Sequence, residues 1–296
     1  MPPADVGAQV VTAQSLRGWP LPEPDDDGTK HDRGTVAVVG GAVSTPGAVL
    51  LAGLAALRAG AGRLQVLTVE PTAVALGVAL PEAMVVGLPC GPGGSVAGDA
   101  GDRVVEGTSG ADAVVLGPGL LGRGPGGRAD VRRLLEDVLD RTDAALVLDA
   151  GALTALAGDP ALLDSCAARV VLTPNEGELA ALLDGDGLEG EQASRAVTER
   201  YGAVVCSRGW VTSPDGRAWS VQAGGVGLGT SGSGDVLAGL VGGVLARGAE
   251  PAQAAVWGQY LHAAAGDRLT SRVGRLGFLA RELLDEVPAV LGTLRP

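Results

Sequence analysis

The chain is poor in aromatic residues, histidine and cysteine. Its 296 residues include one Phe, two Tyr, four Trp, two His and three Cys. Because Cys90, Cys166 and Cys206 stand alone, without CxxC spacing, the sequence indicates neither a zinc site nor a disulfide framework. Two histidines leave little room for a His-rich metal site or a His-dependent triad, so we expect other side chains to carry the chemistry.

Positive charge and long apolar runs are also scarce. The chain has 22 Lys and Arg against 34 Asp and Glu, a net charge of −12, which argues against a nucleic-acid or anionic-membrane surface. No apolar stretch reaches the roughly 18 residues of a membrane span without a Gly or a charge. The first 27 residues lack the basic and apolar regions of a signal peptide. We therefore expect a cytoplasmic protein that binds small molecules, with no nucleic acid and no membrane as partner.

Glycine and small apolar residues are abundant. Apolar residues make up 46% of the chain, and 49 glycines are dispersed between its periodic segments. This composition is typical of buried parallel strands flanked by Ala-rich helices. The expected helices are 48–59, 131–139, 235–247, 251–269 and 279–287. The expected strands are 35–39, 64–69, 83–86, 113–116, 145–148, 170–172 and 203–206, followed by a hairpin of 211–212 with 218–221.

Strands that alternate with helices predict βαβ units and a mostly parallel sheet that is covered on both faces. We expect residues 1–33, with Pro20, Pro22, Pro24 and the acidic run Asp25–Asp27, to form an irregular N-terminal arm. Residues 34–296 are expected to form a single catalytic domain. Ligands bind at the carboxyl ends of the strands in such sheets. Small, polar or turn residues follow the strands there: Gly40-Gly41, Gly117-Pro118-Gly119, Asp149, Thr173-Pro174-Asn175 and Arg208-Gly209.

The strongest motif is the glycine-rich segment Gly229–Asp235, which leads directly into an apolar helix. Free N–H groups of such a turn, together with the helix dipole, form a cradle for an anion. Asp235 would lie beside this cradle, where it can accept a proton from a hydroxyl that attacks a phosphate. The alternative is an Asp that only caps the helix after a flexible loop.

Two common nucleotide motifs are absent from the sequence. No Gly-Lys-Ser/Thr is present, so the glycine-rich segment is not a Walker A loop. The stretch 40–47 lacks the GxGxxG spacing of a Rossmann fingerprint, which makes a plain dehydrogenase a poor interpretation.

A second motif is Thr173–Glu178, which follows a buried strand and opens a helix. Asn175 and Glu178 are three residues apart, so they share a face of that helix. An amide and a carboxylate there can orient water around Mg²⁺. They can equally form a capping box that only stabilises the start of the helix.

Taken together, these motifs resemble those of a known superfamily. The segment Gly229–Gly239 looks like the GxGD anion-hole signature of the ribokinase superfamily, and Asn175-x-x-Glu178 is similar to its NxxE magnesium motif. The fuller pattern resembles the ADP-dependent NAD(P)H-hydrate dehydratases across about residues 10–290. Its other matching stretches are His31–Gly41, Pro46–Ala48, Arg58–Gly62, Gly117–Leu120, Leu148–Leu153 and His262–Asp267.

The resemblance implies a ribokinase-like three-layer α/β/α sandwich with a mostly parallel central sheet and no separate lid domain. It implies a hydro-lyase that restores NADH or NADPH from the hydrated cofactor. ADP or ATP, with Mg²⁺, would phosphorylate the C6 hydroxyl so that it leaves as phosphate. The choice between ADP and ATP, and between the two hydrated cofactors, stays open. The resemblance also implies a homo-oligomer, with a tetramer favoured, and the apolar helix 251–269 is its expected contact.

Residue roles are also implied by the resemblance. Asp235 would be the catalytic base, and Gly232, Ser233 and Gly234 would line the anion hole. Substrate would contact Ala48, Gly119, Asn175 and Asp235, and a metal would be held through water by Asn175 and Glu178. The nucleotide would contact Arg208, Gly209, Trp210, Val211, Thr212 and Gly234.

The sequence departs from the family at two of these positions. The family usually has His where this chain has Asn175, and Lys where it has Arg208. Two other functions stay open: a ribokinase-like kinase of a small alcohol, such as a vitamin precursor or a sugar, and a nucleotide-binding relative without activity. A turnover assay separates the last from both enzymes.

Overall fold

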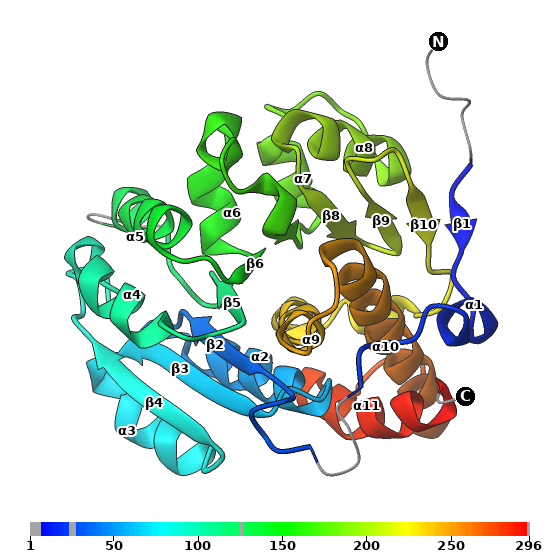
Figure 1. Ribbon diagram of the computed structural model, residues 1–296, viewed down its shortest axis with the longest axis horizontal. Helices are drawn as coiled ribbons and strands as arrows, with labels where there is room; N and C mark the ends of the chain where they lie inside the picture. The colour runs from blue at the N-terminus through cyan, green and yellow to red at the C-terminus, as the bar shows by residue number, and fades with distance from the viewer. Residues whose placement is uncertain (1–6, 24–27, 123, 125–126, 295–296) are drawn as a thin grey trace.

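A single sheet of ten strands runs through the part of the chain that the structure describes, a computed structural model of residues 7–23, 28–122, 124 and 127–294 (Figure 1). The strand order is β1-β10-β9-β8-β7-β6-β5-β2-β3-β4. Strands β2 to β8 are mutually parallel, and β9 is antiparallel to both of its neighbours. The strands are β1 (Gln9–Val10), β2 (Thr35–Val39), β3 (Arg63–Val69), β4 (Ala83–Leu88), β5 (Ala113–Leu116), β6 (Ala145–Leu148), β7 (Val170–Leu172), β8 (Val204–Ser207), β9 (Trp210–Thr212) and β10 (Ala218–Ser220).

Helices cover both faces of this sheet, and each face has its own hydrophobic core. In β2, Val36 and Val38 belong to one core and Ala37 and Val39 to the other, because successive strand residues point to opposite faces. The first face carries α1 (Ala13–Arg17), α2 (Pro46–Arg58), α3 (Glu70–Ala79), α9 (Ser233–Ala246), α10 (Pro251–Arg272) and α11 (Ala280–Leu294). The second carries α4 (Gly101–Thr108), α5 (Gly127–Arg141), α6 (Gly151–Leu156), α7 (Glu176–Leu182) and α8 (Gly190–Tyr201). The expected α/β/α sandwich with a mostly parallel sheet is thus confirmed.

The N-terminal segment is more ordered than the sequence analysis expects. Within residues 1–33, β1 pairs with β10, and helix α1 begins with a capping box between Thr12 and Ser15. Trp19 then stacks on Trp219 of β10, with ring centroids 5.7 Å apart. The prediction of an irregular arm is therefore wrong for these residues, which tie the start of the chain to the edge of the sheet. The acidic run Asp25–Asp27 lies outside the described residues.

Other features of the chain follow the expectations. The hairpin of residues 211–212 with 218–221 corresponds to β9 and β10, and three helices close the chain. Cys90, Cys166 and Cys206 are free cysteines. None of the helices within the described residues has the length and apolar character that crossing a membrane requires.

Candidate active site

Glycines at the carboxyl ends of β2 and β5 let two loops touch through their backbones. The Gly41 N–H donates to the Pro118 carbonyl oxygen at 2.8 Å, and a side chain at Gly40 would overlap that same carbonyl. Gly119 adopts a φ of 69°, and a Cβ there would lie 2.8 Å from the Ala48 Cβ. Gly119 and Ala48, two expected substrate contacts, therefore lie side by side at the edge of the sheet that is formed by the carboxyl ends of the parallel strands.

Helices α2 and α9 pack so closely that their N-termini reach the same edge. A Cβ at Gly239 would overlap the backbone of Ala52, and one at Gly243 would overlap Ala56. Because the contacts advance together by four residues, the helices run parallel. One turn earlier on each helix stand Ala48 and Asp235, so the packing brings these two residues to one end of the pair.

The glycine-rich turn forms the start of α9. Gly232 is the N-cap residue with φ 88°, and a Cβ there would lie 2.5 Å from Leu51 Cδ1 of α2. Ser233 is buried, and its hydroxyl lies 2.8 Å from the His262 Nε2 atom on α10. The Ser233 side chain thus points to α10, and its backbone N–H donates to the Thr230 carbonyl oxygen at 3.2 Å, a turn contact that an anion bound there would have to share or replace.

Gly234 is the second residue of α9, and the fold gives no reason for glycine there. Its φ is not positive, and a Cβ at this position would meet no atom of the described residues within 4 Å. The N–H groups in the first turn of a helix lack acceptors within the helix. The open space above Gly234, beside these donors, is of the kind that an anion fills in glycine-rich turns.

Asp235 stands beside two other acidic side chains. Partial burial, with a smaller contribution from the nearby Glu178 carboxylate, raises the pKa of Asp235 to about 6. Asp149, at the end of β6, is buried and accepts a 2.8 Å hydrogen bond from the Thr173 hydroxyl. Burial, and then the charges of Glu178 and Asp235, raise the pKa of Asp149 to about 8. The structure therefore gathers three carboxyl groups from β6, α7 and α9, and a cation bound nearby would relieve their repulsion.

Asn175 and Glu178 form a capping box at the start of α7. The Asn175 Oδ1 accepts from the Glu178 N–H at 3.0 Å, and the Glu178 Oε2 accepts from the Asn175 N–H at 2.9 Å. Burial raises the pKa of Glu178. Among the described residues, no group of three or more His, Cys, Asp or Glu is arranged to hold a metal ion directly. The oxygens of this motif suit Mg²⁺ held through water, which Mg²⁺ commonly retains.

Arg208 lies in the turn between β8 and β9, at the same edge of the sheet. Its side chain is 63% exposed and forms an ion pair with Glu176, the residue after Asn175. Gly209 follows with φ 85°, and its carbonyl oxygen accepts from the Val221 N–H at 2.7 Å. Trp210 is half-buried at the start of β9. The structure thus brings Arg208, Gly209 and Trp210 to the candidate site.

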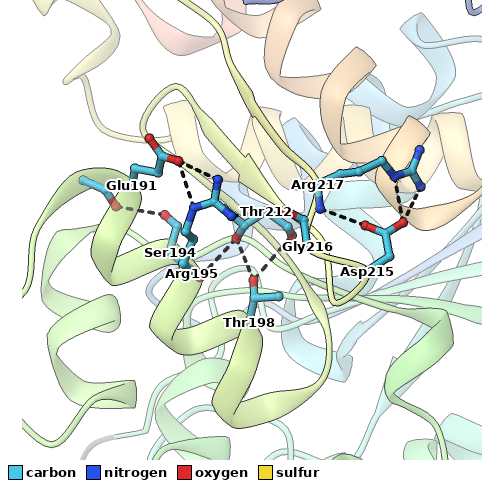
Figure 2. Close-up of polar contacts among 9 residues, drawn as sticks. Glu191, Ser194, Arg195, Thr198, Thr212, Asp215, Gly216 and Arg217 are labelled. Atoms are coloured by element: carbon cyan, nitrogen blue, oxygen red, sulfur yellow. Dashed lines mark hydrogen bonds and ion pairs between the residues drawn. The ribbon is translucent and has the colours of Figure 1, made fainter. Parts of the chain in front are cut away.

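Val211 and Thr212 are the two expected nucleotide contacts whose side chains the structure does not bring there. Val211 is buried in a hydrophobic core. Thr212 ends β9 at the opposite edge of the sheet, and its hydroxyl lies 2.6 Å from the Thr198 hydroxyl (Figure 2). Each residue of a strand advances the chain by about 3.3 Å, and Thr212 is four residues after Arg208, so its side chain lies well away from that turn.

A cavity of about 340 Å³ opens at this opposite edge, lined by residues of α8 and of the turn after β9. Several of its polar lining side chains already have partners: Arg195 pairs with Glu191 at 2.7 Å, and the Thr198 and Thr212 hydroxyls bind each other (Figure 2). The carboxyl groups and the glycine-rich turn lie at the other edge. We therefore place the candidate site by its chemistry and not by the size of this cavity.

Backbone strain marks the same edge. Three non-glycine residues in the described part of the chain have positive φ: Ala150 at 44°, Asp184 at 55° and Arg208 at 39°. Ala150 follows Asp149 at the end of β6, and Arg208 follows the last residue of β8. Such conformations cost about 1–3 kcal/mol each and cluster at functional sites.

Two polar contacts at this edge were missed from the sequence. The Asp149 carboxyl group interacts electrostatically with those of Glu178 and Asp235, which come from two other elements. The contact between Ser233 and His262 joins α9 to α10. An acidic residue directly after a buried strand was the available signal for Asp149, whereas His262 stands inside an apolar helical stretch that resembles core.

Comparison with known proteins places this geometry in a family. A family model described as NAD(P)H-hydrate dehydratase matches residues 36–289. A relative from Xanthomonas campestris pv. campestris, named ADP-dependent (S)-NAD(P)H-hydrate dehydratase, is 43% identical and matches 97% of each chain. A Moorella thermoacetica relative, named bifunctional NAD(P)H-hydrate repair enzyme, is 36% identical over 97% of this chain. The match spans 54% of that longer protein.

Solved structures agree with the sequence relatives. An ADP/ATP-dependent NAD(P)H-hydrate dehydratase from Bacillus subtilis, co-crystallised with ATP and Mg²⁺, is 27% identical with a TM-score of 0.80. The match covers 98% of this chain and all of that one. A ribokinase-like superfamily protein from Enterococcus faecalis has a TM-score of 0.81 at 23% identity, with 98% and 97% of the two chains covered. These neighbours confirm the expected ribokinase-like fold.

Proposed function

The chain belongs to the NAD(P)H-hydrate dehydratase family, and from this premise we propose that it removes water from hydrated NADH or NADPH at the expense of ADP or ATP. The activity is that of a hydro-lyase driven by phosphoryl transfer. One observation carries the mechanism: Asp235, with its pKa raised to about 6, stands in the first turn of α9 beside the open space at Gly234.

Asp235 is the proposed general base. A carboxylate with a pKa near 6 is ionised at neutral pH, yet it accepts a proton more readily than an ordinary Asp. It takes the proton of the C6 hydroxyl, whose oxygen attacks the terminal phosphorus of the nucleotide. The bond from that phosphorus to the departing nucleotide breaks, which leaves AMP from ADP or ADP from ATP.

The phosphorylated intermediate then loses phosphate. The C6–O bond breaks with its electron pair on phosphate, assisted by the lone pair of the ring nitrogen. Loss of a proton from the neighbouring ring carbon restores the double bond of NAD(P)H. The N–H groups of Gly232, Ser233 and Gly234 are proposed to bind the charged phosphoryl oxygens, and preorganised donors of this kind are a large source of rate.

Substrate and nucleotide are proposed to approach from different parts of the edge. Ala48, Gly119 and Asn175 would contact the hydrated cofactor, since the first two lie together at the ends of β2 and β5. Arg208, Gly209 and Trp210 would contact the nucleotide from the turn after β8. We leave Val211 and Thr212 out of the proposed nucleotide contacts because of their positions in β9.

A magnesium ion would be held through water by Asn175 and Glu178. There it would offset the charge of the nucleotide phosphates and of the three carboxyl groups. The Glu178 Oε1 is not used in the capping box, and this oxygen is the one proposed to face the hydrated ion.

We propose a homo-oligomer, with a tetramer favoured, but not through α10. The helix 251–269 was expected as the contact, yet Trp257 is 4% exposed and Leu261 is fully buried within this chain. The Trp257 Nε1–H donates to the Trp19 carbonyl oxygen at 2.9 Å. Better candidates are the exposed side chains of Val74, Val78 and Met84 on α3 and β4, the last strand of the sheet. Light scattering at micromolar concentration tests the proposal, and a monomeric mass contradicts it.

Location in the cytoplasm also stays a proposal, supported by the free cysteines and by a substrate derived from a reduced cofactor. The assay for the function itself is incubation with hydrated NADH and either ADP or ATP. Recovery of NADH absorbance that depends on the nucleotide supports the proposal. No recovery with either nucleotide, from a folded protein, contradicts it.

A further inference from the structure

The stretch His262–Asp267 on α10 has no role in the mechanism above, although it touches residues 224–233, which lead into and include part of the glycine-rich turn, at three places. Figure 1 shows α10 beside α9 on the same face of the sheet. His262, Ala263, Gly266 and Asp267 share one side of α10, because residues three and four apart are neighbours on a helix. This side faces the segment 224–233, which leads into the anion site.

The first contact holds the start of that segment. The Gly224 N–H donates to the Asp267 Oδ1 at 3.1 Å. Gly224 has a φ of 88°, and a Cβ there would lie 3.2 Å from the Ala263 Cβ. The backbone at residue 224 therefore lies against α10 and is fixed by a carboxylate.

The second contact holds its middle. A Cβ at Gly266 would lie 2.7 Å from the Leu228 Cδ2 and 2.9 Å from the Leu228 Cγ. Glycine at 266 thus leaves the space that the Leu228 side chain occupies. A larger residue at 266 would push Leu228 and its segment away from the helix.

The third contact holds its end, next to the catalytic machinery. The Ser233 hydroxyl lies 2.8 Å from the His262 Nε2, and both side chains are buried. Ser233 is the first residue of α9, and Gly234 and Asp235 follow it directly. A rotation of Ser233 would therefore turn the N–H groups of the anion site and the Asp235 carboxylate together.

We propose that His262, Gly266 and Asp267 hold the segment 224–233 in the shape that forms the anion site, and that His262 is a positioning residue for Asp235 that acts through Ser233. The inference rests on the proposed dehydratase function. Burial lowers the pKa of His262 to about 4, so the imidazole is neutral near neutral pH and can share one hydrogen with the Ser233 hydroxyl.

The test compares His262→Leu, Ser233→Ala and the double variant. Misplacement of reacting groups by about 1 Å costs on the order of 10² in rate. We expect kcat to fall by about ten- to a hundredfold in each single variant and KM for ADP to rise. Because both changes remove the same contact, the double variant should be no worse than the poorer single variant.

His262→Gln is the rescue variant, because its side-chain amide can still bind the Ser233 hydroxyl; it should keep kcat within about threefold of the wild type. Gln253→Leu is the matched control on the same helix. Gln253 and His262 are each 6% exposed, and the Gln253 Nε2–H donates to the Pro20 carbonyl oxygen at 2.9 Å, far from the site. This control should lower the melting temperature and leave KM for ADP unchanged.

A second readout does not depend on turnover. ADP binding raises the melting temperature of the folded protein. That rise should shrink in His262→Leu and Ser233→Ala and persist in His262→Gln and Gln253→Leu. If His262→Leu does not fold, Ser233→Ala alone carries the test.

Unchanged kinetic constants in folded His262→Leu or Ser233→Ala overturn the inference, and additive losses in the double variant overturn the route through Ser233. A wild-type protein without dehydratase activity contradicts the proposed function instead.

Discussion

Replacement of Gly234 by alanine separates binding of the anion from folding. Most glycines at this edge are required by the fold, because a Cβ there would strike a neighbour or meet a positive φ. At Gly234, a Cβ would meet no atom of the described residues within 4 Å. The new methyl group would therefore enter only the space proposed for the phosphoryl group.

Gly234→Ala is expected to raise the stability of the fold and to lower the rate of the reaction. Alanine in place of glycine in a helix stabilises by about 0.5–1 kcal/mol, which raises Tm by about 1–4 °C. A methyl group that keeps the phosphoryl oxygens out of reach of even one N–H donor should cost as much as loss of that donor, about 10² to 10³ in kcat. Gly234→Ala should therefore be slightly more stable than the wild type and at least about 10²-fold slower.

Gly292→Ala is the matched control. Gly292 is exposed in α11, and a Cβ there would also meet no atom of the described residues within 4 Å. Thermal melting and the NADH recovery assay are run on both variants. The control should gain similar stability and keep full activity. A fully active Gly234→Ala would refute the placement of the phosphoryl group over this residue.

Three further predictions follow. Asp235→Asn should lower kcat by about 10² to 10⁴ with an unchanged fold by circular dichroism. In the wild type, kcat/KM should fall as pH drops below about 6, the pKa of this base, and a flat profile from pH 5 to 8 would exclude Asp235 as the base. Asp149 has a folded-state pKa of about 8, above its ordinary 3.8, so its contribution to stability is fully present below pH 3.8 and is lost as pH rises through 8. Asp149→Asn should thus stabilise the protein more at pH 8 than at pH 5 in urea unfolding, and a gain independent of pH would contradict the assigned burial. Arg208→Ala should raise KM for ADP with a smaller change in kcat, and the rise in KM should shrink at high salt. Replacement of the exposed Arg217 by alanine, at the opposite edge, should leave KM for ADP unchanged, and equal kinetic constants in the two variants would remove Arg208 from the site.

The sheet could be predicted from the sequence because each buried strand is a short apolar run that ends in turn residues. Strand β1 could not, since two residues carry no periodicity and pair only with distant β10. Helix α3 was missed because Pro71 and Gly77 interrupt its pattern, although Pro71 stands in its first turn, where proline is tolerated.

The position of Asp235 could also be predicted, because a glycine run directly before an apolar helix is a local signal. The direction of the Ser233 side chain could not, since it depends on His262, 29 residues later in the chain. The position of the Thr212 side chain could not be predicted either, since a hairpin strand leads away from the turn at Arg208 within three residues. Long-range contacts of this kind leave no trace in spacing or composition.

The central claim is that phosphoryl transfer at Asp235 and the glycine-rich turn drives the dehydration. Its most direct test is the stoichiometry of one reaction mixture that contains hydrated NADH, ADP and Mg²⁺, with NADH, AMP and phosphate measured together. The account predicts one AMP and one phosphate for each NADH recovered by the wild type, and almost none of the three from Asp235→Asn. Recovery of NADH without consumption of ADP, or consumption of ADP without recovery of NADH, would contradict it.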